Sequence, residues 1–186
     1  LAIVITAIIS LMKDHVDNLR ECGIKATYLH SGLTMSERRK AIERCTNGNY
    51  KFLYISPERL GSDSFIEQLK HMNVCLIVVD EAHCISQWGY DFRPSFLKIA
   101  DIRNVKPRVP VLALTATATP LVVNDIQEKL QFSKPNVFAK SFVRNNLSYV
   151  VRQTEDKIGQ LVRIVNSVPG TSIVYVRSRK KTKQIS

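Results

Sequence analysis

The feature that most constrains the fold of this chain is a set of short apolar runs that alternate with helix-like segments. Residues 74–79 (VCLIVV) and 109–115 (VPVLALT) are apolar almost throughout, which is typical of parallel strands covered on both faces. Between such runs, apolar residues recur at helical spacing, as they do from Ile8 to Leu19. This alternation predicts an α/β fold with a doubly wound parallel sheet and helices on both faces.

Local signals place the individual elements. Thr34 and Glu37 form a capping-box pattern that predicts a helix through about Cys45. Thr119 followed by Pro120 predicts another helix start. A third helix is expected after Asp156, which can cap it, and further helices at 64–72 and from 177 onward. The remaining expected strands are 2–6, 24–29, 50–55, 135–142, 147–151 and 171–176.

The bulk composition excludes several classes of protein. No apolar run approaches the length that a membrane-spanning helix needs. The cysteines at positions 22, 45, 75 and 84 form no CxxC pair, so no zinc site is expected in this chain. Their spacing instead favours a reducing, intracellular compartment.

Positive charge is concentrated in the last third of the chain. Residues 134–186 carry a net charge of +9, whereas the preceding 133 residues carry +2. A basic surface favours a polyanionic partner. Alternatively, the chain stops inside a second module and the imbalance reflects that cut; both interpretations stay open at this stage.

The run at 74–79 leads directly into Asp80, Glu81 and His83. Ligands of such sheets bind beyond the carboxyl ends of the strands, so these side chains are expected in that crevice. Asp80 suits Mg²⁺, Glu81 can orient or deprotonate an attacking water, and His83 can hydrogen-bond to a neighbouring strand end. The alternative is a solvated loop, but the position directly after a buried strand favours a site.

An aromatic loop follows the DEAH segment (80–83) within a few residues. Trp88, Tyr90 and Phe92 alternate along it and Arg93 completes it. Aromatic faces and guanidinium groups stack on bases of any sequence, which suits contact with a single strand. The alternative is that these rings fold into the core, which is the commoner fate of Trp and Phe.

Six segments resemble motifs of the RecQ family of DNA helicases, in superfamily 2, and follow the family's order, and the resemblance extends over essentially the entire chain. They are ITAIISLMKDHVDNL (5–19), YISPERL (54–60), DEAHCISQWGYDFRP (80–94), ALTATAT (113–119), SFVRNNLSYVV (141–151) and SIVYVRSRKK (172–181). The resemblance implies a RecA-like lobe of the P-loop NTPase class. It also implies ATP and Mg²⁺ as cofactors and DNA as partner.

The resemblance assigns roles to single residues. Asp80 would hold Mg²⁺ through water, Glu81 would be the catalytic base, and Thr115 and Thr117 would link the nucleotide site to the DNA site. Local hydrogen bonds at a strand end are the alternative for these threonines. Tyr90 departs from the family pattern, which typically has histidine there, so a role that needs a titrating imidazole is in doubt.

Weaker DNA-side candidates lie elsewhere in the family motifs. Ser10 and Lys13, and likewise Ser56 and Arg59, can hold a backbone phosphate with hydroxyl and cationic groups. For each exposed cation, a solvated surface role is the alternative. Ala7 and Ile8 stand where family members usually have Pro-Leu, a change that apolar packing tolerates.

The resemblance also predicts the domain organisation. Residues 1–146 would form most of the first RecA-like lobe, 147–157 the connection, and 158–186 the beginning of the second lobe. No GxxxxGK[ST] phosphate loop occurs in the chain. The family places that loop just upstream of Leu1 and the arginine finger beyond Ser186, so negligible ATPase and no unwinding are expected of this chain alone.

The expected function is therefore part of an ATP-dependent 3′-to-5′ DNA helicase acting in repair or recombination. The protein would reside in the nucleoid or cytoplasm of a bacterium or in the nucleus of a eukaryote, with no membrane association. Two alternatives remain: an ATP-independent nucleic-acid module, and an RNA helicase. The SQWGYDFRP loop argues against the RNA helicase.

Overall fold

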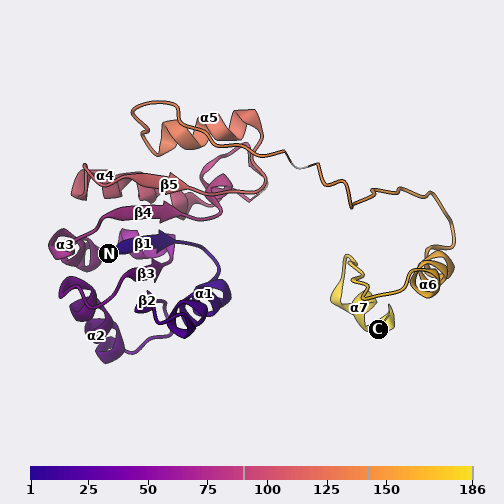
Figure 1. Ribbon diagram of the computed structural model, residues 1–186, viewed down its shortest axis with the longest axis horizontal. Helices are drawn as coiled ribbons and strands as arrows, with labels where there is room; N and C mark the ends of the chain where they lie inside the picture. The colour runs from indigo at the N-terminus through magenta and orange to yellow at the C-terminus, as the bar shows by residue number, and fades with distance from the viewer. Residues whose placement is uncertain (90, 142, 186) are drawn as a thin grey trace. The chain divides into compact units, whose positions relative to one another are not determined.

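A parallel sheet forms the centre of the first part of the chain. The computed structural model describes residues 1–89, 91–141 and 143–185, which fall into two compact units, 1–137 and 138–186. The strands are β1 (Ala2–Ile5), β2 (Ala26–Leu29), β3 (Phe52–Ile55), β4 (Leu76–Val79) and β5 (Val111–Ala113). They lie in the order β2-β3-β1-β4-β5, with every neighbouring pair parallel (Figure 1). The predicted α/β class is confirmed.

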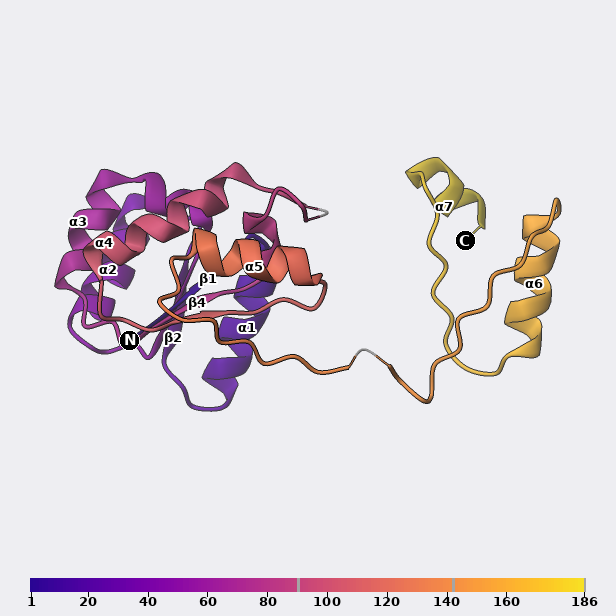
Figure 2. The same cartoon turned by 90° about the horizontal axis from the view of Figure 1, so that it is seen from above.

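Helices cover both faces of this sheet. The α-helices of the unit are α1 (Ile9–Glu21), α2 (Met35–Thr46), α3 (Asp63–His71), α4 (Ile102–Val105) and α5 (Pro120–Lys129). Figure 2 shows α1 on the opposite side of the strands from α3 and α4. Met12 of α1 packs with Val4 and Val78 on one face, whereas Phe65 of α3 and Ile126 of α5 join the core of the other face.

Among the described residues of the same unit, three 3₁₀ helices follow the strands and helices. They are η1 (Pro57–Gly61), η2 (Ala82–Ile85) and η3 (Pro94–Asp101). Two of them follow strand ends directly: η1 comes after β3, and η2 comes after the turn that ends β4. The family-like segments YISPERL and DEAH therefore sit at the same edge of the sheet.

The helix boundaries follow the predicted caps. Thr34 accepts a hydrogen bond from the Glu37 backbone N–H at 3.3 Å, and the Glu37 carboxylate accepts from the Thr34 backbone N–H at 2.9 Å. Hydrogen bonds from Thr34, first its hydroxyl and then its backbone, hold the pKa of Glu37 below its ordinary value. Thr119 caps α5 in the same way, accepting from the Val122 N–H at 3.4 Å.

The strand register brings three polar residues to one level at the carboxyl edge. Ile5 of β1 pairs with Ile55 on one side and Val79 on the other. The next residues are therefore Thr6 in the middle, with Ser56 and Asp80 beside it. Backbone hydrogen bonds continue the ladder by one step: the Thr6 N–H donates to the Ile55 carbonyl at 3.1 Å, and the Asp80 N–H donates to the Ile5 carbonyl at 2.9 Å.

The second unit contains two helices among its described residues, α6 (Lys157–Ser167) and α7 (Arg179–Ile185). Asp156 caps α6 as predicted, accepting from the Gly159 N–H at 2.8 Å. The strands predicted at 135–142, 147–151 and 171–176 are wrong for the residues that the structure describes there. Backbone groups form a strand only with a partner, and no described residue after 137 is buried enough to supply a packed face.

No helix in the described part of the chain combines the length and the apolar character needed to cross a lipid bilayer.

Candidate functional site

The turn that follows β4 carries the acidic pair Asp80 and Glu81. Glu81 has φ 51° and ψ 42°, a left-handed conformation that is uncommon for a residue with a side chain. The Asp80 carboxylate stabilises the turn, since its Oδ1 accepts the Glu81 backbone N–H at 3.0 Å. Strain of this kind gathers where a structure has to aim a functional side chain, so the turn marks the acidic pair as the centre of a candidate site.

A polar network joins this turn to the end of β5. His83 Nδ1 lies 3.2 Å from Glu81 Oε2 and 3.1 Å from Thr115 Oγ1. Thr115 Oγ1 also accepts the Thr117 backbone N–H at 3.3 Å. The hydrogen bond expected between His83 and a neighbouring strand end is present. Nδ1 carries at most one proton, so it can donate to Glu81 or to Thr115 but not fully to both.

Backbone hydrogen bonds hold the two strand ends in place around that network. The Leu114 N–H donates to the Val79 carbonyl at 2.8 Å, and the Ala82 N–H donates to the Leu114 carbonyl at 2.9 Å. Both sides of the turn are thus tied to β5. Movement of the DEAH segment therefore requires movement of the segment that carries Thr115.

A buried hydroxyl that the sequence reading missed lies beside Asp80. Thr6 has no exposed surface, and its Oγ1 has no hydrogen-bond partner among the described residues. Alternation along β1 puts Thr6 on the face that carries Val4 and Tyr54. Asp80 continues the same row, and its negative charge, after burial itself, raises the pKa of Tyr54. An unpaired hydroxyl on the neighbouring strand is suited to holding a water that also binds the Asp80 carboxylate.

The acidic residues fit one kind of metal better than others. The described residues contain no group of three His, Cys, Asp or Glu side chains placed to hold a metal ion. Mg²⁺ commonly uses one or two carboxylates together with waters and phosphate oxygens. Asp80, half-buried at the strand end and neighbour to Thr6 in the strand register, fits such a role.

The aromatic loop divides between exposed and partly buried side chains. Trp88 is 69% exposed, whereas Phe92 and Arg93 are half-buried; Tyr90 lies outside the described residues. Arg93 Nη2 is 2.6 Å from Asp91 Oδ2, and this hydrogen bond holds the pKa of the Asp91 carboxyl below its ordinary value. The exposed Trp88 side chain is therefore available for stacking, and Arg93 is held in an ion pair with Asp91.

The loop is anchored to the DEAH segment by its backbone. Fully buried Ser86 accepts the Trp88 N–H on its hydroxyl at 3.2 Å and the Gly89 N–H on its carbonyl at 3.1 Å. The Arg93 N–H donates to the Cys84 carbonyl at 2.9 Å. A Cβ on Gly89 would lie 2.6 Å from the His83 carbonyl oxygen, so only glycine fits there without displacing backbone.

The Cys84 side chain lies between His83 of the DEAH segment and Asp91 of the aromatic loop. Its Sγ lies 3.7 Å from His83 Nε2 and 3.9 Å from Asp91 Oδ2. Burial, and then the charge of Asp91, raises the pKa of the Cys84 thiol to about 11. The thiol therefore stays neutral near pH 7 and serves as packing between the histidine and the loop.

The remaining candidates occupy two positions along the same sheet edge. Ser10 and Lys13 are exposed in the first turns of α1, while Ser56 and Arg59 are half-buried at the end of β3. Glu58, which the sequence reading did not single out, connects η1 to the aromatic loop. Burial alone would raise the pKa of Glu58, but hydrogen bonds from its own backbone, Ser56 and Ser95, with the charge of Arg93, bring it below the ordinary value.

Known proteins with sequences similar to this chain are helicases. The DEAD/DEAH box helicase family matches residues 1–126. A protein named ATP-dependent DNA helicase RecQ from Pasteurella multocida is 40% identical over 187 residues, covering 100% of this chain and 30% of that protein. The protein of the same name from Bacillus subtilis is 43% identical, covering 98% and 31%. The chain thus spans about a third of the length of these relatives.

A solved structure shares the fold at low identity. The Mycobacterium smegmatis helicase Lhr, solved with single-stranded DNA and AMP-PNP, is 18% identical with a TM-score of 0.61. The match covers 99% of this chain and 27% of that one.

Proposed function

This chain belongs to the DEAD/DEAH box helicase family, and we propose that it is part of an ATP-dependent DNA helicase of the RecQ type. The observation that carries the proposal is the continuous path from Glu81 through His83 to the aromatic loop. A nucleotide-hydrolysing site and a strand-binding loop are thereby built on one segment. The identity to proteins named RecQ supports the choice of DNA over RNA as substrate.

On the nucleotide side, the chain's own groups divide the work. Asp80 would hold Mg²⁺ through a water, and Thr6 would orient the Asp80 carboxylate. Bound Mg-ATP supplies the phosphoryl group that is transferred to water. Glu81 accepts the proton of the attacking water, while His83 holds the Glu81 carboxylate and reports its position to Thr115.

On the DNA side, the loop grips a single strand without reading its sequence. Trp88 stacks on a base, with Tyr90 and Phe92 as further aromatic surfaces, and Arg93 adds a cation when it leaves Asp91. Backbone phosphates are held by hydroxyls and cations at the same edge of the sheet. These are Ser10, Lys13, Ser56 and Arg59.

The proposed domain assignment is that residues 1–146 belong to the first RecA-like lobe, 147–157 to the connection and 158–186 to the second lobe. In the whole protein, cycles of ATP binding and hydrolysis would move the lobes and advance the enzyme 3′-to-5′ along one strand. The 186-residue chain by itself carries metal-binding and base residues but no phosphate loop. It is expected to show negligible ATPase activity, and the protein would act in an intracellular compartment, on DNA in repair or recombination.

The test is ATP hydrolysis by the full-length protein that carries this chain. We expect single-stranded DNA to stimulate phosphate release strongly and RNA to stimulate it weakly. Stimulation by RNA alone would favour the RNA-helicase alternative. Nucleic-acid binding with no ATP hydrolysis, and no GK[ST] segment upstream, would favour a module that only binds.

A further inference from the structure

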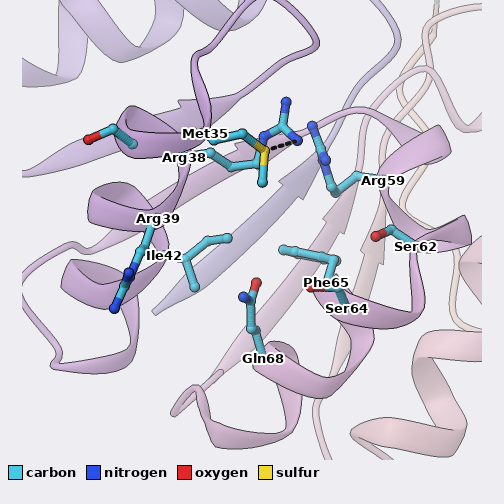
Figure 3. A pocket seen from close by; sticks show the side chains of 10 residues that line it. Met35, Arg38, Arg39, Ile42, Arg59, Ser62, Ser64, Phe65 and Gln68 are labelled. Atoms are coloured by element: carbon cyan, nitrogen blue, oxygen red, sulfur yellow. Dashed lines mark hydrogen bonds between the residues drawn. The ribbon is translucent and has the colours of Figure 1, made fainter.

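A groove lies between α2 and the segment formed by η1 and the start of α3 (Figure 3). Its volume is about 580 Å³. The lining residues are Met35, Ser36, Arg38, Arg39, Ile42, Arg59, Ser62, Ser64, Phe65 and Gln68. No acidic side chain is among them, so the groove presents cations, hydroxyls and one amide together with the apolar side chains of Met35, Ile42 and Phe65.

Two arginines face each other at one end of this groove. In Figure 3 the guanidinium groups of Arg38 and Arg59 point toward one another from α2 and η1. Burial, and then the positive charge of Arg38, lowers the pKa of Arg59. No carboxylate in the described part of the chain forms an ion pair with either of them. Two like charges that face each other repel until an anion lies between them.

The hydrogen-bond inventory points the same way. The Nε atoms of Arg38 and Arg59 are both buried and have no partner among the described residues. The terminal nitrogens of Arg38 reach only the Leu33 carbonyl, at 3.4 Å, and the Met35 sulfur, at 3.8 Å. Buried donors without acceptors cost free energy, so a structure keeps them mainly where a ligand completes them.

We propose that Arg38 and Arg59 together form a phosphate seat that takes one backbone phosphate of a DNA strand. The inference rests on the proposed function and extends it, because Arg38 lies outside the segments that carry the helicase resemblance. Each guanidinium offers a planar fork of N–H donors that matches two phosphate oxygens. The hydroxyls of Ser62 and Ser64 provide further donors at the rim.

An acidic peptide is the competing occupant, and the groove suits it less well. A peptide would need apolar contacts in addition to its carboxylates. The floor offers few such contacts, since Ile42 is 8% exposed and Phe65 is 2% exposed, and among the apolar lining residues only Met35, at 76%, is well exposed. The arginine pair also lies near the end of β3, which Ser56 follows directly. A DNA strand that crosses this edge of the sheet can therefore reach both Ser56 and the arginine pair.

The first experiment uses inorganic phosphate as the probe and needs no ATP. Thermal unfolding of the full-length protein is measured in phosphate and in chloride at equal ionic strength. Phosphate is expected to raise the Tm of the wild type more than the Tm of Arg38→Met, since the phosphate loop expected in the full-length protein responds in both. In chloride, Arg38→Met is expected to melt above the wild type, because the repulsion is removed and the apolar stem is kept.

The second experiment measures affinity for single-stranded DNA against salt. Arg38→Met should lower the slope of log K against log salt by about 0.7, the contribution of one phosphate contact on a single strand. Lys40→Met is the matched control, since it removes one charge from the exposed face of the same helix; its effect on the slope is expected to be smaller.

Either of two results overturns the seat. One is an Arg38→Met protein that is less stable in chloride and responds to phosphate as strongly as the wild type does. The other is stabilisation by oligoglutamate and not by phosphate, which assigns the groove to an acidic peptide. Neither experiment uses ATP. If the full-length protein did not hydrolyse ATP, the helicase proposal would fail, but the phosphate and DNA-binding results would still decide whether the seat exists.

Discussion

The backbone of Gly89 lies against the carbonyl of His83, so closely that a Cβ at position 89 would be 2.6 Å from the His83 oxygen. His83 in turn lies 3.2 Å from the Glu81 carboxylate. A loop that carries the exposed Trp88 is therefore in direct contact with the segment that carries the proposed base. Displacement of the loop by a bound strand has a short mechanical route to the nucleotide side.

Replacing Gly89 with alanine tests that route. The added Cβ has to push the His83 carbonyl or the loop aside, and a misplacement of about 1 Å near a catalytic group can cost about 10²-fold in rate. DNA-stimulated ATP hydrolysis by the full-length protein should fall by up to that factor. Gln87→Ala, an exposed change in the same loop, serves as the control and should retain stimulation. Full stimulation in Gly89→Ala would contradict the coupling.

The left-handed backbone of Glu81 should lower the stability of the protein, whereas its carboxylate should be necessary for ATP hydrolysis. Its left-handed backbone favours glycine, so Glu81→Gly should raise the free energy of unfolding by about 1 kcal/mol. The same variant loses the proton acceptor, and ATP hydrolysis should drop about 10²- to 10⁴-fold. Denaturant unfolding and phosphate release measure the two effects.

The chain offers a matched control for that variant. Gln131 also has a positive φ, 54°, but lies just beyond the end of α5 and has no proposed part in catalysis. Gln131→Gly should give a comparable gain in stability with an unchanged rate of hydrolysis. Equal loss of activity in both variants would point to a general effect of glycine rather than to the role of Glu81.

Thr6 provides a second case in which stability and activity should move apart. A buried hydroxyl without a partner costs about 1–3 kcal/mol, so Thr6→Val should unfold no more easily than the wild type and can gain part of that amount. The proposed contact with Asp80 is lost, however, and the Mg²⁺ concentration needed for half-maximal hydrolysis should rise. Thr6→Ser restores the hydroxyl and should restore the Mg²⁺ response. Reduced stability with an unchanged Mg²⁺ response would give Thr6 a purely structural role.

The cysteines predict a pH effect on stability. Burial raises the pKa of the Cys45 thiol to about 12 and that of Cys84 to about 11, from an ordinary value of 9.0. Above pH 9 these thiols ionise in the unfolded chain before the folded one, so the unfolded state binds fewer protons and the free energy of unfolding falls as pH rises. Thermal unfolding between pH 8 and pH 11 should show the decline, and Cys45→Ala should make it less steep while the contribution of Cys84 remains.

Thiol labelling checks the same assignment without unfolding. Cys22 and Cys75 are exposed, whereas Cys45 and Cys84 are buried. A thiol reagent at pH 8 should modify Cys22 and Cys75 in the folded chain and all four cysteines in denaturant. Rapid labelling of Cys84 in the folded protein would show that the contact between the DEAH segment and the loop opens readily.

Local chemistry made much of the fold predictable. Thr34, Thr119 and Asp156 cap helices as expected, because a cap depends on residues only three positions apart. The apolar run at 74–79 gave β4 for a similar reason. The expected strands at 147–151 and 171–176 failed because a strand depends on a partner, and apolar alternation says nothing of whether that partner is present.

In the candidate site, too, residues could be predicted where local sequence decides their position and not where packing of distant segments decides it. Asp80 and Glu81 could be placed because they directly follow a recognisable strand. Thr6 could not, since its relation to Asp80 comes from the parallel register across two strands. The roles of Gly89 and Arg38 could not be predicted for similar reasons. The role of Gly89 depends on a close approach of two backbone segments, and that of Arg38 on two segments that meet in space.

The most direct test of the central claim is ATP hydrolysis by full-length Trp88→Ala, measured with and without single-stranded DNA. If the loop transmits DNA contact to the Glu81–His83 pair, the unstimulated rate should match the wild type and the stimulation by DNA should be lost. An unstimulated rate that falls as far as the stimulated one, or stimulation that survives with wild-type DNA affinity, would contradict the account.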